Sequence, residues 1–252
     1  MQTLNLLKNQ LTDLKLHGIN GSLDARLEAA RKEGSALEDV MALLLQDEID
    51  YKKSKKIQRL LKNAHFKEQA SIEGFETPKA RGVEKSLLND LSTGSFLRHG
   101  QNIIISGPTG AGKSYLAQGI GHSICRQGLA GVFYRLNKLL EEIVLHRAQN
   151  QYLILLKRLS NPHLLILDDF GIRPLQAHEF QDFYDLIDER GENKSIILTT
   201  QVPPENWNEV IPDPVICEAI TDRLVSNAVQ FQLKLEKDSF RAKKRDRRPL
   251  KN

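Results

Sequence analysis

The sequence has no hydrophobic run long enough to cross a bilayer and very little cysteine. A transmembrane helix needs about 20 apolar residues in succession, and the 252 residues contain no such run. Residues 1–5 carry neither a basic segment nor a continuous apolar stretch, so we expect no secretory signal. The two cysteines, Cys125 and Cys217, lack metal-ligand spacing and are expected to be small buried side chains. We therefore expect a soluble, cytoplasmic protein with no membrane partner.

Acidic residues are missing from one stretch of the chain, although the formal net charge is only +4. Between Lys52 and Lys67 there are seven Lys or Arg and no Asp or Glu. The alternative is a solvated helix face, although such a face usually carries charges of both signs. Charge of one sign favours contact with phosphates. We predict that nucleic acid, without recognition of base sequence, is contacted by Lys52, Lys53, Lys55, Lys56, Arg59 and Lys62.

Glycine is concentrated in residues 107–114, Gly-Pro-Thr-Gly-Ala-Gly-Lys-Ser, which match the phosphate-binding pattern G-x-x-x-x-G-K-[ST] in full. An apolar, β-branched run at 101–106 precedes it, and residues 115–124 follow with helical spacing. In such a strand–loop–helix unit the glycines let backbone N–H groups point at phosphate oxygens, and the helix N-terminus adds partial positive charge. The pattern predicts an ATP site made by Gly107, Pro108, Thr109, Gly110, Ala111, Gly112, Lys113, Ser114 and Tyr115.

A second site element lies at 164–169, where four apolar residues end in two aspartates. This is typical of a buried strand that delivers an acid to the nucleotide crevice at its carboxyl end. We predict that Lys113 contacts the β- and γ-phosphates, that Ser114 and Asp168 hold Mg²⁺, and that Asp169 is the general base for the attacking water.

The remaining patterns predict a doubly wound α/β domain. Its five parallel strands are expected at 101–106, 131–135, 164–169, 195–200 and 229–235, with helices between them. The strand at 195–200 presents Thr200 and Gln201 at its end, where they are expected to sense the γ-phosphate or hold the water. A polar loop without such a role is the alternative.

The chain begins with a leucine-rich segment that predicts a small all-α module. Leucines at helical spacing indicate a helix closed by His17 and Gly18; a second helix covers 22–33 and a third continues into the basic run. Residues 71–76 break that helix, and another is expected from about Pro78 to Ser92. We predict a helical module at 1–70, an ATPase domain at 71–242 and a basic, disordered tail at 243–252.

These features together resemble the AAA+ ATPases of the initiator and helicase-loader group. The resemblance is carried by the glycine loop, the aspartate pair, the Thr-Thr-Gln end of a strand, Asp222-Arg223-Leu224 and Asp238-Ser239-Phe240-Arg241. Within that group, the leucine-rich start, the segment 48–59 and the bridge 72–75 are similar to the IstB-type transposition helpers of bacterial insertion sequences. The similarity runs from about residue 4 to 245.

The resemblance implies further roles. Arg223 matches the arginine finger, which acts on ATP bound by a neighbouring subunit; an exposed ion pair with Asp222 is the alternative. Arg241 matches the second sensor, although Lys237-Asp238 replace the usual Gly-Glu before it, and Gln201 takes the place of the usual asparagine of the first sensor. Most AAA+ proteins carry Asp-Glu where this chain carries Asp168-Asp169, so we expect slow turnover in the isolated protein.

The function implied is an ATPase that assembles on duplex DNA as an ATP-dependent oligomer and stimulates a cognate transposase. Two other functions stay open. A DnaC-type helicase loader would bind single-stranded DNA and a replicative helicase, and residues 52–67 offer only Phe66 as an aromatic for base stacking. A nucleotide switch that does not hydrolyse ATP would have no use for Asp169, Gln201 and Arg223.

Overall fold

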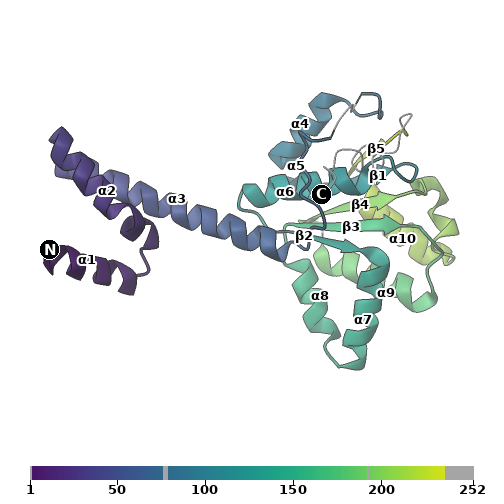
Figure 1. The fold of residues 1–252 in the computed structure, drawn as a ribbon. Helices are drawn as coiled ribbons and strands as arrows, with labels where there is room; N and C mark the ends of the chain where they lie inside the picture. Colours follow the sequence, from purple (N-terminus) through teal and green to yellow (C-terminus); the bar gives the residue numbers. More distant parts are fainter. Residues whose placement is uncertain (1, 76–78, 192, 236–252) are drawn as a thin grey trace, which may run out of the picture. The chain divides into compact units, whose positions relative to one another are not determined.

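A computed structural model describes residues 2–75, 79–191 and 193–235 of the chain (Figure 1). The chain divides into two compact units, Met1–Arg59 and Leu60–Asn252. The division falls within a helix, eleven residues before the boundary expected near residue 70. Within the described residues, no helix is both long and apolar enough to span a membrane.

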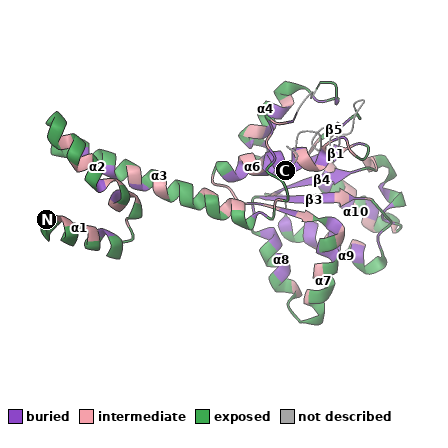
Figure 2. Cartoon of the chain, viewed as in Figure 1, coloured by how far each residue is buried: buried purple, intermediate pink, exposed green. Residues whose placement is uncertain are grey.

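The first unit is helical, as predicted. Its helices are α1 (Gln2–Asp13), α2 (His17–Glu33) and α3 (Leu37–Asn63), and α3 continues past the end of the unit. A small apolar core holds them together and consists of Leu11, Ile19, Leu23, Val40 and Leu44. Most other side chains of these helices are exposed (Figure 2).

The expected end of the first helix at His17 and Gly18 is wrong, because these residues begin α2. The Glu48 carboxylate, from α3, accepts the backbone N–H of Gly18 at 2.6 Å and that of Ile19 at 3.1 Å. It thereby satisfies N–H groups that a helix start leaves free. A Cβ on Gly18 would lie 2.7 Å from the Glu48 Cα, so the glycine permits close helix packing rather than ending a helix.

The second unit contains the predicted five-stranded parallel sheet, in the order β2-β3-β4-β1-β5. The strands are β1 (Asn102–Ser106), β2 (Gly131–Arg135), β3 (Leu164–Phe170), β4 (Ser195–Thr200) and β5 (Ala228–Gln232). β1 lies between the central strand β4 and the edge strand β5, and the glycine loop follows it at the carboxyl end of the sheet. β5 stops at Gln232, three residues before its predicted end.

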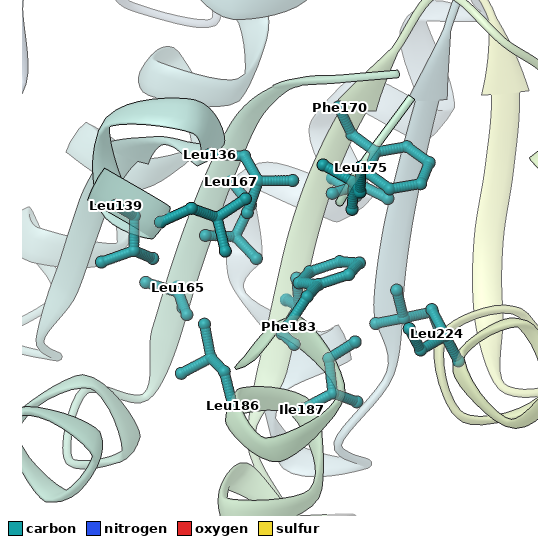
Figure 3. Packing of buried hydrophobic residues seen from close by; sticks show 14 of the residues in the cluster. Leu136, Leu139, Leu165, Leu167, Phe170, Leu175, Phe183, Leu186, Ile187 and Leu224 are labelled. Atoms are coloured by element: carbon teal, nitrogen blue, oxygen red, sulfur yellow. The ribbon is translucent and has the colours of Figure 1, made fainter. Parts of the chain in front are cut away.

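Helices cover both faces of the sheet. One face packs against α4 (Lys85–Thr93), α5 (Ser95–Arg98) and α6 (Lys113–Arg126). The other packs against α7 (Leu136–Ala148), α8 (Tyr152–Ser160), α9 (Ala177–Arg190) and α10 (Pro214–Val225), in the cluster drawn in part in Figure 3. Successive strand residues alternate between the two clusters, as a strand buried on both faces requires. The short 3₁₀ helix η1 (Pro204–Glu209) seats Trp207, fully buried, against Phe170.

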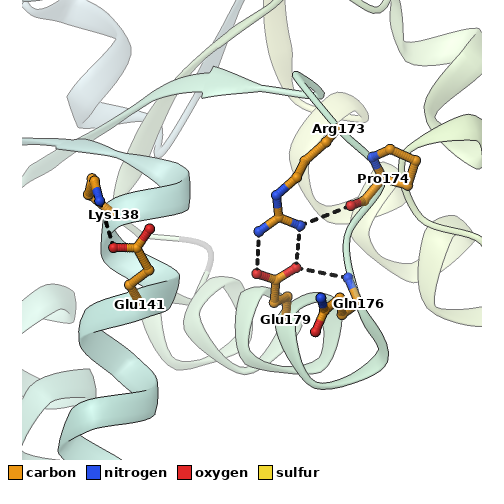
Figure 4. A network of polar contacts seen from close by, with 6 residues as sticks. All are labelled: Lys138, Glu141, Arg173, Pro174, Gln176 and Glu179. Atoms are coloured by element: carbon orange, nitrogen blue, oxygen red, sulfur yellow. Dashed lines mark hydrogen bonds and ion pairs between the residues drawn. The ribbon is translucent and has the colours of Figure 1, made fainter.

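The segment between β3 and α9 is held by a polar network (Figure 4). Arg173 forms two hydrogen bonds with the Glu179 carboxylate, at 2.7 and 2.6 Å. The same carboxylate accepts the Gln176 backbone N–H at 2.9 Å and completes a capping box at the start of α9. The Arg173 guanidinium holds the pKa of Glu179 below its usual range. This network fixes the chain just after the aspartate pair.

The helix predicted from Pro78 begins instead at Lys85, and Thr77 and Pro78 lie outside the described residues. Residues 79–82 form turns because the chain there meets β5 and its continuation. The Arg81 carbonyl accepts the Lys234 N–H at 2.8 Å, and Gly82, at φ 83°, would carry a Cβ 3.0 Å from the Gln232 carbonyl. These tertiary contacts displace the predicted helix start.

Residues 64–75, which we call the strap, pack on the rest of the second unit. The Ala64 carbonyl accepts the Phe133 N–H of edge strand β2 at 2.8 Å. Ile72 and Phe75 are buried in the core on the α6 face of the sheet. The strap therefore belongs to the wall of the second unit.

Candidate nucleotide-binding and catalytic site

The glycine loop has the backbone conformation that only glycine adopts readily. Gly107, Gly110 and Gly112 have φ values of 139°, 84° and 99°. A Cβ on Gly107 would lie 2.3 Å from the Leu233 carbonyl oxygen, so no other residue fits there. α6 begins at Lys113, directly after the loop, and its free N–H groups face the phosphate-binding turn.

Two charged side chains hold this loop. Lys113 is almost fully buried, and its Nζ donates to the carbonyl oxygens of Gly107 at 2.7 Å and Pro108 at 3.0 Å. Arg81, fully buried, donates from Nη1 to the Ala111 carbonyl at 3.0 Å. Arg81 could not be predicted from a local pattern, because it contacts the loop from a segment 30 residues away.

The structure brings Ser114 and Asp168 together. Asp168 is buried, and burial raises the pKa of its carboxyl, while hydrogen bonds from Thr199 and Ser114 partly offset that rise. The Thr199 hydroxyl donates to Asp168 Oδ1 at 2.6 Å. A serine hydroxyl and a carboxylate are the hard oxygen ligands that Mg²⁺ prefers. A bound cation would also offset the burial of the Asp168 charge, so these residues fit Mg²⁺.

Asp169 lies at an irregularity of β3. The register between β3 and β4 shifts between Leu167 and Phe170, and Asp169 has a φ of 67°, which is unusual for a residue with a side chain. Its N–H donates to the Thr199 hydroxyl at 3.0 Å. Its Oδ2 lies 3.8 Å from Arg135 Nε, at the end of β2. The irregularity thus turns the second aspartate toward the cavity, as strained backbone often does at active sites.

The residues at the carboxyl end of β4 differ in part from the prediction, which placed both Thr200 and Gln201 at the nucleotide site. Gln201 lines the cavity, and its Oε1 accepts the Thr109 hydroxyl at 3.0 Å. Thr200 is fully buried, and its hydroxyl donates to the Val202 carbonyl and accepts the Val202 N–H. Its side chain is therefore turned away from the nucleotide site, while Thr199, which was not predicted, contacts both aspartates.

The glycine loop, the aspartate pair and the strap surround one cavity of about 400 Å³. Most of the predicted residues line it: Thr109, Gly110, Gly112, Lys113, Ser114, Tyr115, Asp168, Asp169 and Gln201. Sequence reasoning missed Lys67, Glu68, Gln118, Phe133, Arg135 and Ile172. Arg135 could have been predicted, because it is a basic residue at the carboxyl end of strand β2. No local pattern indicates that the strap reaches the cavity.

The strap is tied to α6 by side chains of that helix. Gln118 Oε1 accepts the backbone N–H groups of Lys67 at 2.7 Å and Glu68 at 3.2 Å. Nε2 of His122 lies 2.9 Å from the Glu68 carbonyl oxygen. Tyr115, predicted to contact nucleotide, also accepts the Ser71 N–H through its hydroxyl at 3.4 Å. The helix that carries Lys113 and Ser114 therefore also positions the strap.

Arg223 does not line this cavity. It lies near the end of α10, where its Nη2 pairs with Asp188 at 2.7 Å and its guanidinium lies 4.6 Å from the Tyr184 ring centroid. The alternative to the finger role was an ion pair between Arg223 and Asp222. The structure instead pairs Arg223 with Asp188 of α9. The guanidinium remains partly exposed, with 38% of its side-chain surface accessible. Arg241 lies outside the described residues.

The predicted basic side chains lie along α3 and are exposed. Lys52 approaches Glu48 at 3.4 Å, and the Lys55 ammonium lies 5.4 Å from the Tyr51 ring centroid. Lys52, Lys55, Lys56 and Arg59 are spaced to share one side of the helix. In the described part of the chain, Lys53, Lys56, Arg59 and Lys62 form no ion pair. No cluster of three or more metal-ligating side chains occurs among the described residues.

The fold is that of solved AAA+ proteins. The structure of the DnaC helicase loader aligns with a TM-score of 0.54 and 17% identity, over 66% of this chain and 97% of that one. AMPPCP-bound DnaA from Aquifex aeolicus aligns with a TM-score of 0.57 and 18% identity, over 70% of this chain and 53% of that one. The match spans about half of the DnaA chain, and at this identity both likenesses show the fold alone.

Sequence relatives define the family. The ATP-binding protein Rv3427c in insertion sequence of Mycobacterium tuberculosis is 32% identical over 240 residues, 95% of each chain. The ATP-binding protein of insertion sequence IS21 from Pseudomonas aeruginosa is 28% identical over 235 residues, 93% of this chain and 88% of that one. The model of the family described as IstB-like ATP binding protein matches residues 9–248. The predicted resemblance is confirmed: the chain belongs to the family of IstB-like ATP-binding proteins of insertion sequences.

Proposed function

We propose that the protein is a Mg²⁺-dependent ATPase that assembles on duplex DNA and stimulates the transposase of its insertion sequence. The observation that carries the proposal is the arrangement of Ser114, Asp168 and Asp169 beside a complete glycine loop. The family supplies the context of an insertion sequence. The reaction converts ATP and water to ADP and phosphate.

Binding depends on the loop and on Lys113. The loop N–H groups and the start of α6 bind the phosphates, and Lys113 contacts the β- and γ-phosphates. Ser114 and Asp168 hold Mg²⁺, which when bound neutralises charge on the phosphates. Thr199 keeps the Asp168 carboxylate oriented through its 2.6 Å hydrogen bond.

Hydrolysis depends on Asp169 and Gln201, both at the cavity wall. Asp169 accepts a proton from the attacking water and Gln201 helps to hold that water. Arg135 Nε lies 3.8 Å from the Asp169 carboxylate, so this arginine competes with the attacking water for the carboxylate. This competition and the short side chain support slow basal turnover.

Arg223 completes the site in an oligomer. It lies outside its own nucleotide cavity and is partly exposed, as a residue that acts on a neighbouring subunit must be. In other phosphoryl-transfer systems such a finger contributes about 10³–10⁵ in rate. ATP binding then joins subunits, the exposed lysines of α3 contact DNA phosphates, and hydrolysis releases the assembly.

The test is ATP hydrolysis by the purified chain without DNA, with duplex DNA and with single-stranded DNA, while light scattering follows assembly. We expect duplex DNA to stimulate both ATP hydrolysis and assembly. Added transposase should gain activity only when the protein is bound to ATP. Asp169→Asn is the matched control, since it should bind ATP and assemble but not turn over. Stimulation by single-stranded DNA alone would favour a helicase loader. Full turnover by Asp169→Asn would contradict the proposed role of Asp169.

A further inference from the structure

Two residues of α9 hold the Arg223 side chain. The Nη2 of Arg223 donates to Asp188 Oδ1 at 2.7 Å, and its guanidinium carbon lies 4.6 Å from the centroid of the Tyr184 ring. Tyr184 and Asp188 are four residues apart, which places them on the same side of the helix. One helix therefore supplies both a hydrogen-bond acceptor and an aromatic face for the guanidinium.

The backbone of Arg223 is held as well, from the sheet. Asn102, the first residue of β1, is buried, and its Nδ2 donates to the carbonyl oxygens of Arg223 at 3.1 Å and Leu224 at 3.2 Å. The Asn102 Oδ1 accepts the Ile196 N–H of β4 at 2.9 Å. The last turn of a helix leaves such carbonyls without partners inside the helix. The end of α10 is thereby fixed to two neighbouring strands.

These contacts leave part of the guanidinium available to another molecule. Arg223 and Asp188 line a cavity of about 470 Å³, and their side chains are 38% and 56% exposed. Within the described residues the Arg223 guanidinium donates hydrogen bonds only through Nη2, so Nη1 and Nε can still bind a phosphate oxygen. An ion pair exposed to this extent contributes little to stability. Orientation of the arginine therefore explains the contact better than stabilisation of the fold.

We propose that Asp188 and Tyr184 are positioning residues that hold Arg223 in the orientation in which it contacts ATP bound by a neighbouring subunit. The inference rests on the proposed function, because it requires Arg223 to act between subunits. A long side chain that is already fixed loses less conformational freedom when the phosphate arrives than a free one would. Asp188 holds one end of the guanidinium and Tyr184 supports its face, which leaves the remaining N–H groups for the phosphate.

The first measurement is ATP hydrolysis by the full chain at concentrations at which light scattering shows assembly. Asp188→Ala should lower the rate about tenfold, because it removes a hydrogen bond to a charged group. Asp188→Asn keeps an oxygen acceptor and should lose less. Tyr184→Leu should be slow, whereas Tyr184→Phe keeps the ring and should resemble the natural chain. The matched control is Glu189→Gln, which removes an exposed negative charge from the next position of α9 and should leave the rate unchanged.

Mixed oligomers separate the positioning of Arg223 from a general effect on the fold. When Asp188→Ala is mixed with Asp169→Ala, each Asp188→Ala cavity can receive a natural arginine from its neighbour. The rate per intact cavity should then rise above that of Asp188→Ala alone. When Asp188→Ala is mixed with Arg223→Ala, every arginine that is present lacks its support, so the rate should stay at or below that of Asp188→Ala. A variant damaged in its own fold would not show this difference.

The mixture of Arg223→Ala with Asp169→Ala is the reference, since it tests action between subunits without any change at Asp188. If this reference stays inactive, the finger role is wrong and the inference fails with it. If the reference regains turnover but Asp188→Ala behaves alike in both of its mixtures, only the positioning role is overturned. A rate that rises in Asp188→Ala would also overturn it, because Asp188 would then hold Arg223 away from ATP.

Discussion

Thr199 is the residue on which the geometry of the aspartate pair depends. Its hydroxyl donates to Asp168 Oδ1 and accepts the Asp169 N–H. One side chain therefore orients the predicted Mg²⁺ ligand and also holds the unusual backbone of the predicted base. Nothing in the local pattern distinguishes it from Thr200, because the two lie next to each other on one strand and differ only in which side of β4 they occupy.

We expect Thr199→Val to raise the Mg²⁺ concentration needed for half-maximal ATP hydrolysis and to lower kcat about tenfold or more. The physical reason is the loss of a hydrogen bond to a charged group, which contributes about 1.5–3 kcal/mol. Mg²⁺ titrations of the ATPase rate measure this effect. Thr199→Ser keeps the hydroxyl and should stay near the natural values, whereas equal loss in both variants would mean that the hydrogen bond is not what sets the rate.

Arg26 and Asp47 connect α2 and α3 through two hydrogen bonds, at 2.9 and 2.8 Å. The hydrogen bond from Arg26 lowers the pKa of Asp47 to about 2. Because this folded-state pKa lies below the ordinary value of 3.8, the pair contributes stability above about pH 4 and loses it as the pH falls toward 2. The helical unit should therefore be weakened by acid within this range.

The measurement is the Asp47 carboxyl titration by NMR in the natural chain and in Arg26→Gln, where the Asp47 pKa should return toward its ordinary value. The difference in thermal stability of the helical unit between the two chains should be full above pH 4 and vanish near pH 2. Lys32→Gln, which breaks the exposed pair with Glu28, should leave the Asp47 pKa unchanged. An Asp47 pKa near 4 in the natural chain would refute the coupling.

At the scale of elements, the strap shows how a loop becomes part of a site. Lys67 and Glu68 line the nucleotide cavity although they come from the end of a region that the sequence assigned to the helical module. The Gln118 side chain holds both through their backbone N–H groups. We expect Gln118→Leu to release the strap, since it leaves those N–H groups without their acceptor, at about 1–3 kcal/mol.

Hydrogen–deuterium exchange across residues 64–75 measures that release, and it should be faster in Gln118→Leu. Gln118→Glu keeps an oxygen acceptor at the same place and should retain protection. The apparent affinity for ATP should fall in the leucine variant because a wall of the cavity loosens. Unchanged exchange in Gln118→Leu would show that the apolar contacts of Ile72 and Phe75 hold the strap by themselves.

The elements that could be predicted are those marked by a pattern of neighbouring residues in the sequence. The strand–loop–helix unit around residues 107–114 and the apolar strand ending in Asp168 were identified because each requires particular residues at fixed spacing. The start of α2 at His17 and of α4 at Lys85 could not be derived in this way. Glu48 determines the start of α2, and contacts with β5 and its continuation determine the start of α4. Both contacts come from distant parts of the sequence. Arg81 and the strap were missed for the same reason.

At the scale of the whole molecule, the residues with predicted catalytic roles do not all lie at one site. The cavity holds Lys113, Asp168 and Asp169 but not Arg223. If Arg223 serves a neighbouring subunit, Arg223→Ala should bind ATP normally and hydrolyse it about 10³-fold or more slowly. Nucleotide affinity and turnover are measured separately, by equilibrium binding and by phosphate release.

Mixing supplies the decisive control for that prediction. Arg223→Ala keeps an intact cavity, and Asp169→Ala keeps an intact arginine, so mixed oligomers should contain some complete sites and regain part of the turnover. If the mixture stays inactive while light scattering shows that the two variants co-assemble, action between subunits is ruled out. Arg223 would then be left with the structural role indicated by its pairing with Asp188.

The strap also has a consequence for how such proteins exchange modules during evolution. A new N-terminal module joined at residue 71 would remove Lys67 and Glu68 from the nucleotide cavity and expose the edge of β2 at Phe133. A junction before Leu60 leaves the second unit whole. Recombination between family members should therefore preserve residues 60–75 together with the ATP-binding domain, and chimeras divided within the strap should lose nucleotide binding even when both halves come from active parents.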